Sequence, residues 1–316
     1  MSPVNLLQLI VLAALWGGSF LFIRVAVPDF GVAPLMALRV GIGAAFLVVV
    51  LLTTRPIRQS ITTLRRRAWP LIAVGVLNSA IPFCLFAYAE LTLSAGVTSV
   101  INATSPLWAA LVAFVWLKDR LTTLRSIGMA IGFAGVMILV WNQIAPSSTA
   151  NAANAANADA ALLHGLLAAA AALAAAAFYG VAGSFTKKYL TGVDSLTVAT
   201  GSMLGATLVL APIAFATWPV APVSTTAWQA VLALGIGCTG VAYLLYFHLI
   251  AVAGPTRAMT VTFVIPIFGI LLGAVFLHES VSATMIGGCA VILAGTALAT
   301  GMVKGWPGSK RGAAVR

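Results

Sequence analysis

The chain has 316 residues, of which 61% are hydrophobic and only 7% are charged, and its mean hydropathy is +1.08. Soluble domains carry about 25% charged residues, so the composition excludes a soluble globular protein. The apolar runs are continuous rather than alternating, which favours membrane helices over a membrane β-barrel. Basic loops at a membrane surface account for the net charge of +11, and we expect no nucleic-acid partner.

Long apolar runs recur along the whole chain. About 20 apolar residues are needed to cross a hydrocarbon core about 30 Å thick. By this criterion the sequence predicts an all-α integral membrane protein with ten transmembrane helices. The predicted spans are 4–24, 32–53, 69–89, 94–117, 124–142, 161–185, 195–217, 226–249, 255–277 and 282–302.

The loop charges predict an orientation. If the N-terminus is cytoplasmic, the even-numbered loops and the C-terminal tail together hold every basic residue except Arg24 and Arg39. Cytoplasmic loops of membrane proteins carry an excess of Lys and Arg, so we expect both termini in the cytoplasm. The low-complexity stretch between spans 5 and 6 then lies on the outer side.

One stretch, Gly96–Gly135, occurs twice. At an offset of 160 residues Pro106 falls on Pro266, and Asp119 falls on Glu279. Each copy belongs to a set of five spans, and an odd number of spans means that the second set is inverted in the membrane. Inverted-topology repeats are typical of secondary transporters. The predicted parts are repeat 1 (4–142), a periplasmic linker (143–160), repeat 2 (161–302) and a basic cytoplasmic tail (303–316).

Spans 4 and 9 each combine a proline with a polar face. Pro106 and Pro266 remove a backbone hydrogen bond, so both spans should be broken there, beside protein or a wet cavity. The polar residues near these breaks are candidate substrate contacts, although they could also serve only to join helices. They are Thr98, Asn102 and Ser105 on span 4, and Thr256 and Thr260 on span 9.

Further candidates for the cavity lie on spans 1, 3, 6 and 8. Aromatic rings and hydroxyls at these places could enclose an amphipathic solute, whereas an interfacial aromatic belt is the alternative. These candidates are Trp16, Asn78, Tyr179, Thr239, Tyr243 and Tyr246.

Three ionisable residues lie within or at the ends of spans. Arg39, in span 2, could hold a substrate carboxylate, but a structural pairing with Asp29 or a backbone carbonyl is favoured because span 2 should lie at the edge of the bundle. Glu90 and His248 could carry a proton, or could simply reach the membrane interface. No spacing indicates a metal site, and no cofactor is expected.

A set of motifs resembles a known family. The motifs are Leu15-Trp16-Gly17-Gly18-Ser19-Phe20, Arg39, Gly96…Pro106-Leu107…Leu117-Lys118-Asp119-Arg120-Leu121, and Gly254…Pro266…Leu277-His278-Glu279. From about residue 4 to 302 the chain resembles two EamA repeats of the drug/metabolite transporter superfamily. It departs from the family at Asp119, where a glutamate is usual, and in the second repeat, which has no arginine matching Arg39.

The resemblance implies a carrier of the bacterial inner membrane, commonly an exporter of amino acids or other small metabolites. It also implies a central cavity lined by spans 1, 3, 4, 6, 8 and 9. A membrane-embedded enzyme acting on lipid-linked substrates is the main alternative, but no triad or paired carboxylates are evident. Two further alternatives are a channel, over which the inverted repeat favours a carrier, and a carrier for purines, sugars or cationic drugs. We expect a small-molecule solute and the lipid bilayer as the partners of a monomer.

Overall fold

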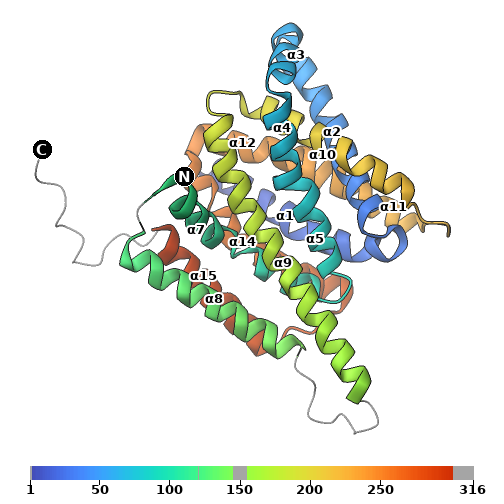
Figure 1. The fold of residues 1–316 in the computed structure, drawn as a ribbon, viewed down its shortest axis with the longest axis vertical. Coiled ribbons are helices and arrows are strands. Elements are labelled where there is room, and N and C mark those ends of the chain that lie inside the picture. Colours follow the sequence, from blue (N-terminus) through green and yellow to red (C-terminus); the bar gives the residue numbers. More distant parts are fainter. Residues whose placement is uncertain (1, 120, 145–154, 302–316) are drawn as a thin grey trace, which may run out of the picture.

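The structure, a computed structural model, describes residues 2–119, 121–144 and 155–301, which contain helices and no strand (Figure 1). Two of the segments, η1 and η3, are π-helical. The helices are α1 Pro3–Phe30, α2 Val32–Thr54, α3 Ile57–Arg66, α4 Ala68–Gly75, η1 Val76–Ala80, α5 Ile81–Ala89, α6 Ala95–Asn102, α7 Ser105–Leu117, α8 Thr123–Ile144, α9 Ala155–Tyr189, α10 Ser195–Ala216, α11 Thr225–Leu232, η3 Ala233–Val241, α12 Ala242–Ala253, α13 Pro255–Ala258, α14 Val261–Leu277 and α15 Ala283–Thr300.

The all-α membrane fold is confirmed. Within the described ranges nine helical segments are long and apolar enough to cross a membrane, and the shorter α14 is the tenth apolar segment. Span 3 is α4–η1–α5, span 4 is α6–α7, span 8 is α11–η3–α12, and span 9 is α13–α14. Large apolar side chains such as Val49, Met137 and Leu208 are exposed, as expected where helices face lipid.

The break predicted at Pro106 is confirmed. α6 ends at Asn102 and α7 starts at Ser105, so Pro106 lies in the first turn of α7, where a missing N–H has little cost. The break predicted at Pro266 is wrong, because α14 continues through that residue. The carbonyl that Pro266 cannot reach belongs to Thr262, in the first turn of α14, and the chain breaks earlier, after Ala258.

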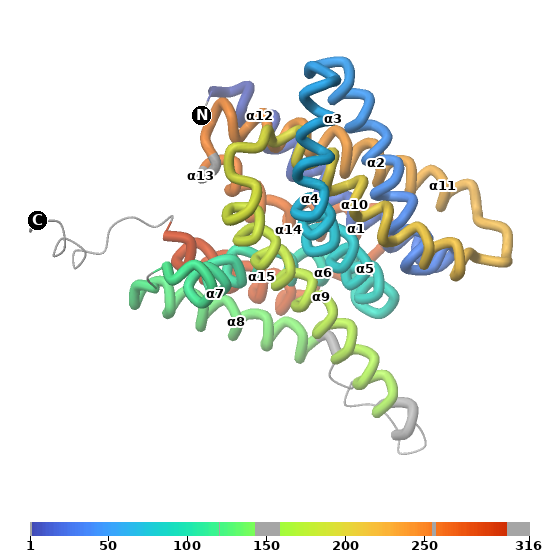
Figure 2. The backbone as a smooth tube through the Cα atoms, turned by 45° about the horizontal axis from the view of Figure 1, so that its top comes forward, coloured from blue at the N-terminus to red at the C-terminus, as the bar shows by residue number. Residues whose placement is uncertain are grey.

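Repeat-equivalent helices make equivalent contacts. α2 packs against its mate α10, and α8 packs against its mate α15, side by side at one edge of the bundle (Figure 2). α1 crosses α14 just as α9 crosses α7. A Cβ on Gly17 would lie 2.6 Å from the Phe268 Cβ, and one on Gly180 would lie 2.7 Å from the Trp108 carbonyl carbon. The two repeats therefore meet where repeat-equivalent glycines let the backbones approach.

The tips of the repeats share an unusual turn. Lys118 and His278, 160 residues apart, are the non-glycine residues with positive φ in the described chain, at 60° and 55°. Each ends a helix, and the next N–H bonds to a carbonyl six residues back, Asp119 to Ala113 and Glu279 to Gly273, both at 3.2 Å. Both repeats therefore end this helix with the same left-handed turn.

Two details of the loops differ from the predictions. The segment between spans 2 and 3 contains α3, which was not predicted as a helix. α9 begins at Ala155, inside the predicted linker, while residues 145–154 and the predicted tail 303–316 lie outside the described residues.

Buried apolar side chains form two main clusters, and Tyr179 contacts both of them.

Candidate functional site

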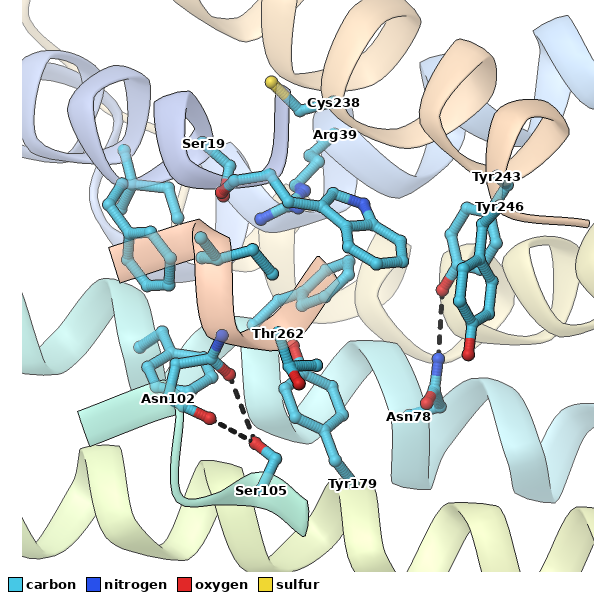
Figure 3. Close-up of a pocket in the computed structure, with 16 residues that line it drawn as sticks. Ser19, Arg39, Asn78, Asn102, Ser105, Tyr179, Cys238, Tyr243, Tyr246 and Thr262 are labelled. Carbon is cyan, nitrogen blue, oxygen red and sulfur yellow. Dashed lines mark hydrogen bonds between the residues drawn. The ribbon is translucent and has the colours of Figure 1, made fainter. Parts of the chain in front are cut away.

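A cavity of ≈ 240 Å³ lies between the two repeats (Figure 3). Side chains from spans 1, 2, 3 and 4 of the first repeat and from spans 6, 8 and 9 of the second repeat line it. The lining residues are Trp16, Ser19, Phe20, Ile23, Arg39, Asn78, Phe83, Phe86, Asn102, Ser105, Tyr179, Cys238, Tyr243, Tyr246, Thr262 and Ile265.

Two π-helical segments border this cavity. Asn78 lies in η1 and Cys238 lies in η3, and these segments interrupt the repeat-equivalent spans 3 and 8. A π-helical insertion disturbs the regular helical register, and such insertions are frequent at functional sites. Both repeats thus place the same backbone irregularity next to the same space.

One side of the cavity carries an amide and two phenols. The Asn78 side-chain nitrogen donates a hydrogen bond of 3.0 Å to the Tyr243 hydroxyl, joining the two repeats. The Tyr246 ring lies 5.1 Å from the Trp16 ring, centroid to centroid, in a tilted arrangement. These four residues were predicted from the sequence, and they form a wall that is apolar in its body and polar at its tips.

The helix break in span 4 supplies a second polar group. The Ser105 hydroxyl donates to the Asn102 carbonyl at 2.6 Å and lies 3.3 Å from the Asn102 side-chain oxygen. Thr262, from the first turn of α14, and Tyr179, from α9, face the same space (Figure 3). A broken helix exposes backbone and side-chain acceptors together, which suits a polar solute at membrane depth.

Arg39 lines the cavity instead of pairing with Asp29. Its Nε donates to the Thr239 Oγ1 at 3.2 Å, and its guanidinium carbon lies 3.8 Å from the centroid of the Phe83 ring. Asp29 accepts a hydrogen bond from the Ser224 backbone N–H at 3.0 Å. The structural pairing expected for Arg39 with Asp29 is therefore wrong.

Other predicted candidates do not line the cavity. Thr98 is fully buried and donates to the Ser94 carbonyl at 2.9 Å. Thr239 is also fully buried, and it accepts a hydrogen bond from the lining residue Arg39. Thr260 donates to the Arg257 carbonyl at 2.7 Å, in the turn before α14. The side chain of Thr256 lies outside the described part of the structure.

The two candidates for proton transfer are also away from the cavity lining. The Glu90 side chain is fully buried, and neither of its carboxylate oxygens has a hydrogen-bond partner among the described residues. Its backbone carbonyl accepts a hydrogen bond from Arg24. His248 lies exposed on α12. A proton role for either residue stays a prediction.

The sequence did not single out the remaining lining residues. Ser19 and Phe20 are in the motif that carried the family resemblance, but neither was proposed as a cavity residue. Helical spacing from Trp16 could have indicated Phe20 and Ile23, whereas nothing local distinguishes the others from core residues. The residues without a prediction are Ser19, Phe20, Ile23, Phe83, Phe86, Cys238, Thr262 and Ile265.

Comparison with known families identifies the fold. A family whose description is "EamA-like transporter family" matches this chain over residues 5–141 and 166–301, which together are most of its length. The chain belongs to the EamA-like transporter family. A solved crystal structure matches this EamA protein with a TM-score of 0.65 at 20% identity, over 97% of this chain and 100% of the other, in agreement with the fold.

Several curated relatives of this EamA protein are named as transporters. One from Streptantibioticus cattleyicolor, "Probable terminal-alkyne amino-acid exporter", is 26% identical and covers 92% of this chain and 91% of its own length. Bacillus subtilis YoaV, "Uncharacterized transporter", is 22% identical, and the match covers 92% of this chain and 94% of YoaV. A protein from Archaeoglobus fulgidus, named "Uncharacterized transporter", is 21% identical, and the match covers 89% of this chain and 92% of the relative. The relatives identify a transporter rather than an enzyme.

The two ends of the bundle differ in this EamA protein. Glu279 accepts hydrogen bonds from the backbone N–H groups of Ala95, at 2.8 Å, and Gly96, at 3.1 Å, at the start of α6. Its repeat mate Asp119 is 53% exposed and lies 4.0 Å from the Lys187 Nζ. One tip carboxylate thus joins the repeats while the equivalent one is solvated. We call the first contact the Glu279 cap.

Proposed function

We propose that this EamA protein exports amino acids or similar small polar metabolites by alternating access. The observation that carries the proposal is the cavity that both repeats build around their broken and π-helical spans. Its volume of ≈ 240 Å³ lies below the range of about 300–1,000 Å³ that is usual for pockets that hold drug-sized ligands. A solute of amino-acid size fits such a space better than a large drug or a lipid-linked sugar does.

The lining supports a solute with both polar and apolar parts. Amide, hydroxyl and guanidinium groups alternate with aromatic rings around the cavity. The name of the Streptantibioticus relative, an amino-acid exporter, agrees with this chemistry. Cationic drugs fit less well, because no carboxylate among the described residues lines the cavity and one arginine does.

The Glu279 cap supports alternating access. A carboxylate at a helix N-terminus is stabilised by the exposed N–H groups and by the helix dipole. On one face this contact ties the end of α14 in the second repeat to α6 of the first, whereas on the other face the repeat-equivalent Asp119 is 53% exposed and makes no such bond among the described residues. Release of the Glu279 cap would open this end of the cavity, as alternating access requires.

We further propose a position in the membrane. The chain lies in a bacterial inner membrane with both termini cytoplasmic, and it acts as a monomer. The Glu279 cap then lies at the outer face and Asp119 at the cytoplasmic face. A C-terminal green fluorescent protein or alkaline phosphatase fusion tests the orientation, because the first is fluorescent only inside and the second is active only outside. Alkaline phosphatase activity would reverse it.

Counterflow in proteoliposomes tests the function. Vesicles loaded with an unlabelled amino acid, purine or sugar should accumulate the same labelled solute, and we expect this for amino acids. Ser105→Trp should block counterflow by filling the cavity. Ser126→Trp, at an exposed serine of α8, is the matched control and should transport normally. No accumulation by wild type would refute the proposal, and normal counterflow by Ser105→Trp would refute this cavity as the site.

A further inference from the structure

Arg39 places a buried positive charge in the cavity. It lies about 10 Å along α2 from the start of that helix, and its side chain is 5% exposed. Among the described residues no carboxylate lies within 4.0 Å of its guanidinium. It is also the only charged side chain in the lining formed by those residues. A charge at this depth is costly to bury without a partner.

The protein fixes the orientation of this guanidinium without neutralising it. The Phe83 ring lies against its face, and Thr239 accepts from Nε. The Thr239 hydroxyl hydrogen is itself donated to the Leu234 carbonyl at 2.9 Å, so the hydroxyl acts towards Arg39 as an acceptor. The hydrogen bonds of the described residues include none from the two terminal nitrogens of Arg39. Figure 3 shows the Arg39 side chain among the residues that line the cavity.

A purely structural arginine would show a different pattern. Buried arginines that hold a fold direct their terminal nitrogens at carboxylates or backbone carbonyls, because an unpaired charge destabilises the protein. Here Thr239 binds Nε and Phe83 covers the face of the Arg39 guanidinium, whereas the two terminal nitrogens, which form a planar fork, have no hydrogen-bond partner among the described residues. This fork matches the geometry of a carboxylate, which can accept two parallel hydrogen bonds from it.

We propose that Arg39 is the anion-binding residue of this cavity, and that the transported solute carries a carboxylate on an apolar or aromatic body. This inference rests on the proposed function. The carboxylate lies against the terminal nitrogens of Arg39, and the body lies among Trp16, Phe20, Phe86 and Ile265. Zwitterions and monoanions are accepted, whereas amines without a carboxylate are rejected because the charge of the lining is positive.

Three probes that share one body test the selectivity. L-phenylalanine is a zwitterion, 3-phenylpropionate is a monoanion, and phenylalaninamide keeps the amine but lacks the carboxylate. Wild-type protein in proteoliposomes should exchange the first two and not the third, and leucine and leucinamide should repeat the pattern. Equal exchange of the amides would overturn the inference and leave the carrier function intact. Exchange of none of these probes by wild type would overturn both.

Substitutions of Arg39 test the residue itself. In Arg39→Met the concentration for half-maximal exchange of the carboxylate probes should rise at least about 30-fold, the loss expected for a hydrogen-bonded ion pair. Arg58→Met, at an exposed arginine of α3, is the matched control and should behave as wild type. An Arg39→Met protein with unchanged half-saturation for carboxylates would overturn the proposal.

The melting temperature in detergent separates binding from a structural role. Removing a charge that is unpaired in the empty cavity should leave the melting temperature of Arg39→Met unchanged or raise it. A marked fall in both Arg39→Met and Arg39→Lys would assign Arg39 to the fold and refute the inference. If Arg39→Met does not fold, Arg39→Lys decides. It keeps the charge without the fork, so its preference for carboxylates over amides should fall about tenfold.

Discussion

The Glu279 cap makes a sharp prediction about the equilibrium between states. In Glu279→Gln one oxygen remains to accept a backbone N–H, while the new amide nitrogen faces the other N–H and cannot accept from it. The bonds at stake are those from Ala95, at 2.8 Å, and Gly96, at 3.1 Å. A hydrogen bond to a charged acceptor contributes about 1.5–3 kcal/mol. Loss of about 2 kcal/mol shifts the contact towards its open form by about 30-fold.

Hydrogen–deuterium exchange of the protein in nanodiscs measures this shift directly. The peptide that covers the first turns of α6 should exchange about 30-fold faster in Glu279→Gln than in wild type, because its first amides lose their acceptor. A peptide from α2, which packs against α10 elsewhere in the bundle, should exchange at the wild-type rate. That reference separates local opening from general loss of structure.

The repeat mate provides the matched control. Asp119→Asn removes the equivalent charge, but Asp119 is 53% exposed and its nearest cation, the Lys187 Nζ, is 4.0 Å away. An exposed pair of this kind contributes about 0–1 kcal/mol. Exchange of the α6 peptide should therefore stay within about twofold of wild type. Equal acceleration in both variants, or none in Glu279→Gln, would refute the assignment of Glu279 as the group that holds this end together.

Three further outcomes test the packing and the cavity. Gly180→Ala should destabilise the protein by about 1–3 kcal/mol, because the new Cβ would lie 2.7 Å from the backbone of α7. Gly183→Ala is the control: no atom lies within 4 Å of its new Cβ, so its melting temperature in detergent should equal that of wild type. Asn102→Leu should reduce counterflow tenfold or more, while Thr260→Leu, outside the cavity lining, should not; a stronger loss in the threonine variant would move the site. Tyr243→Phe should raise the half-saturation concentration for the solute about fivefold, because a hydrogen bond between this hydroxyl and the solute contributes about 1 kcal/mol. An unchanged half-saturation concentration would exclude the hydroxyl from solute binding.

Much of the fold was predictable because it depends on local or repeated properties of the chain. Apolar length predicts a membrane span wherever it occurs. The match of Asp119 with Glu279 predicted two copies, and the positive φ of Lys118 and His278 shows that the copies share even their helix ends. The Pro106 break was also predictable, because proline acts on the four residues before it.

Breaks that depend on neighbouring helices were not predictable. Pro266 obeys the same local rule as Pro106, yet α14 runs through it and the chain turns near Thr260 instead. The π-helical segments have no sequence signature, since an extra residue in a turn is stabilised by the helices around it. α3 was missed because its basic residues were counted as loop charges.

Candidate site residues divide in the same way. Trp16, Asn102 and Tyr243 were found because side chains that can form hydrogen bonds are uncommon inside a membrane span. Thr98 is equally unusual, but its hydroxyl bonds to its own helix and is covered. Periodicity places a residue on one face of a helix and does not say which neighbour covers that face.

By itself the sequence determined the membrane class, the ten apolar segments and the duplication, because hydropathy, charge and repeat spacing are properties of a linear chain. Only the tertiary structure decided that Arg39 faces a cavity and not Asp29, and that Glu279 caps α6 while Asp119 stays solvated. Glu279 and Asp119 have the same chemistry at equivalent positions. Their difference arises from contacts between residues more than 180 positions apart, which depend on how all the helices pack together.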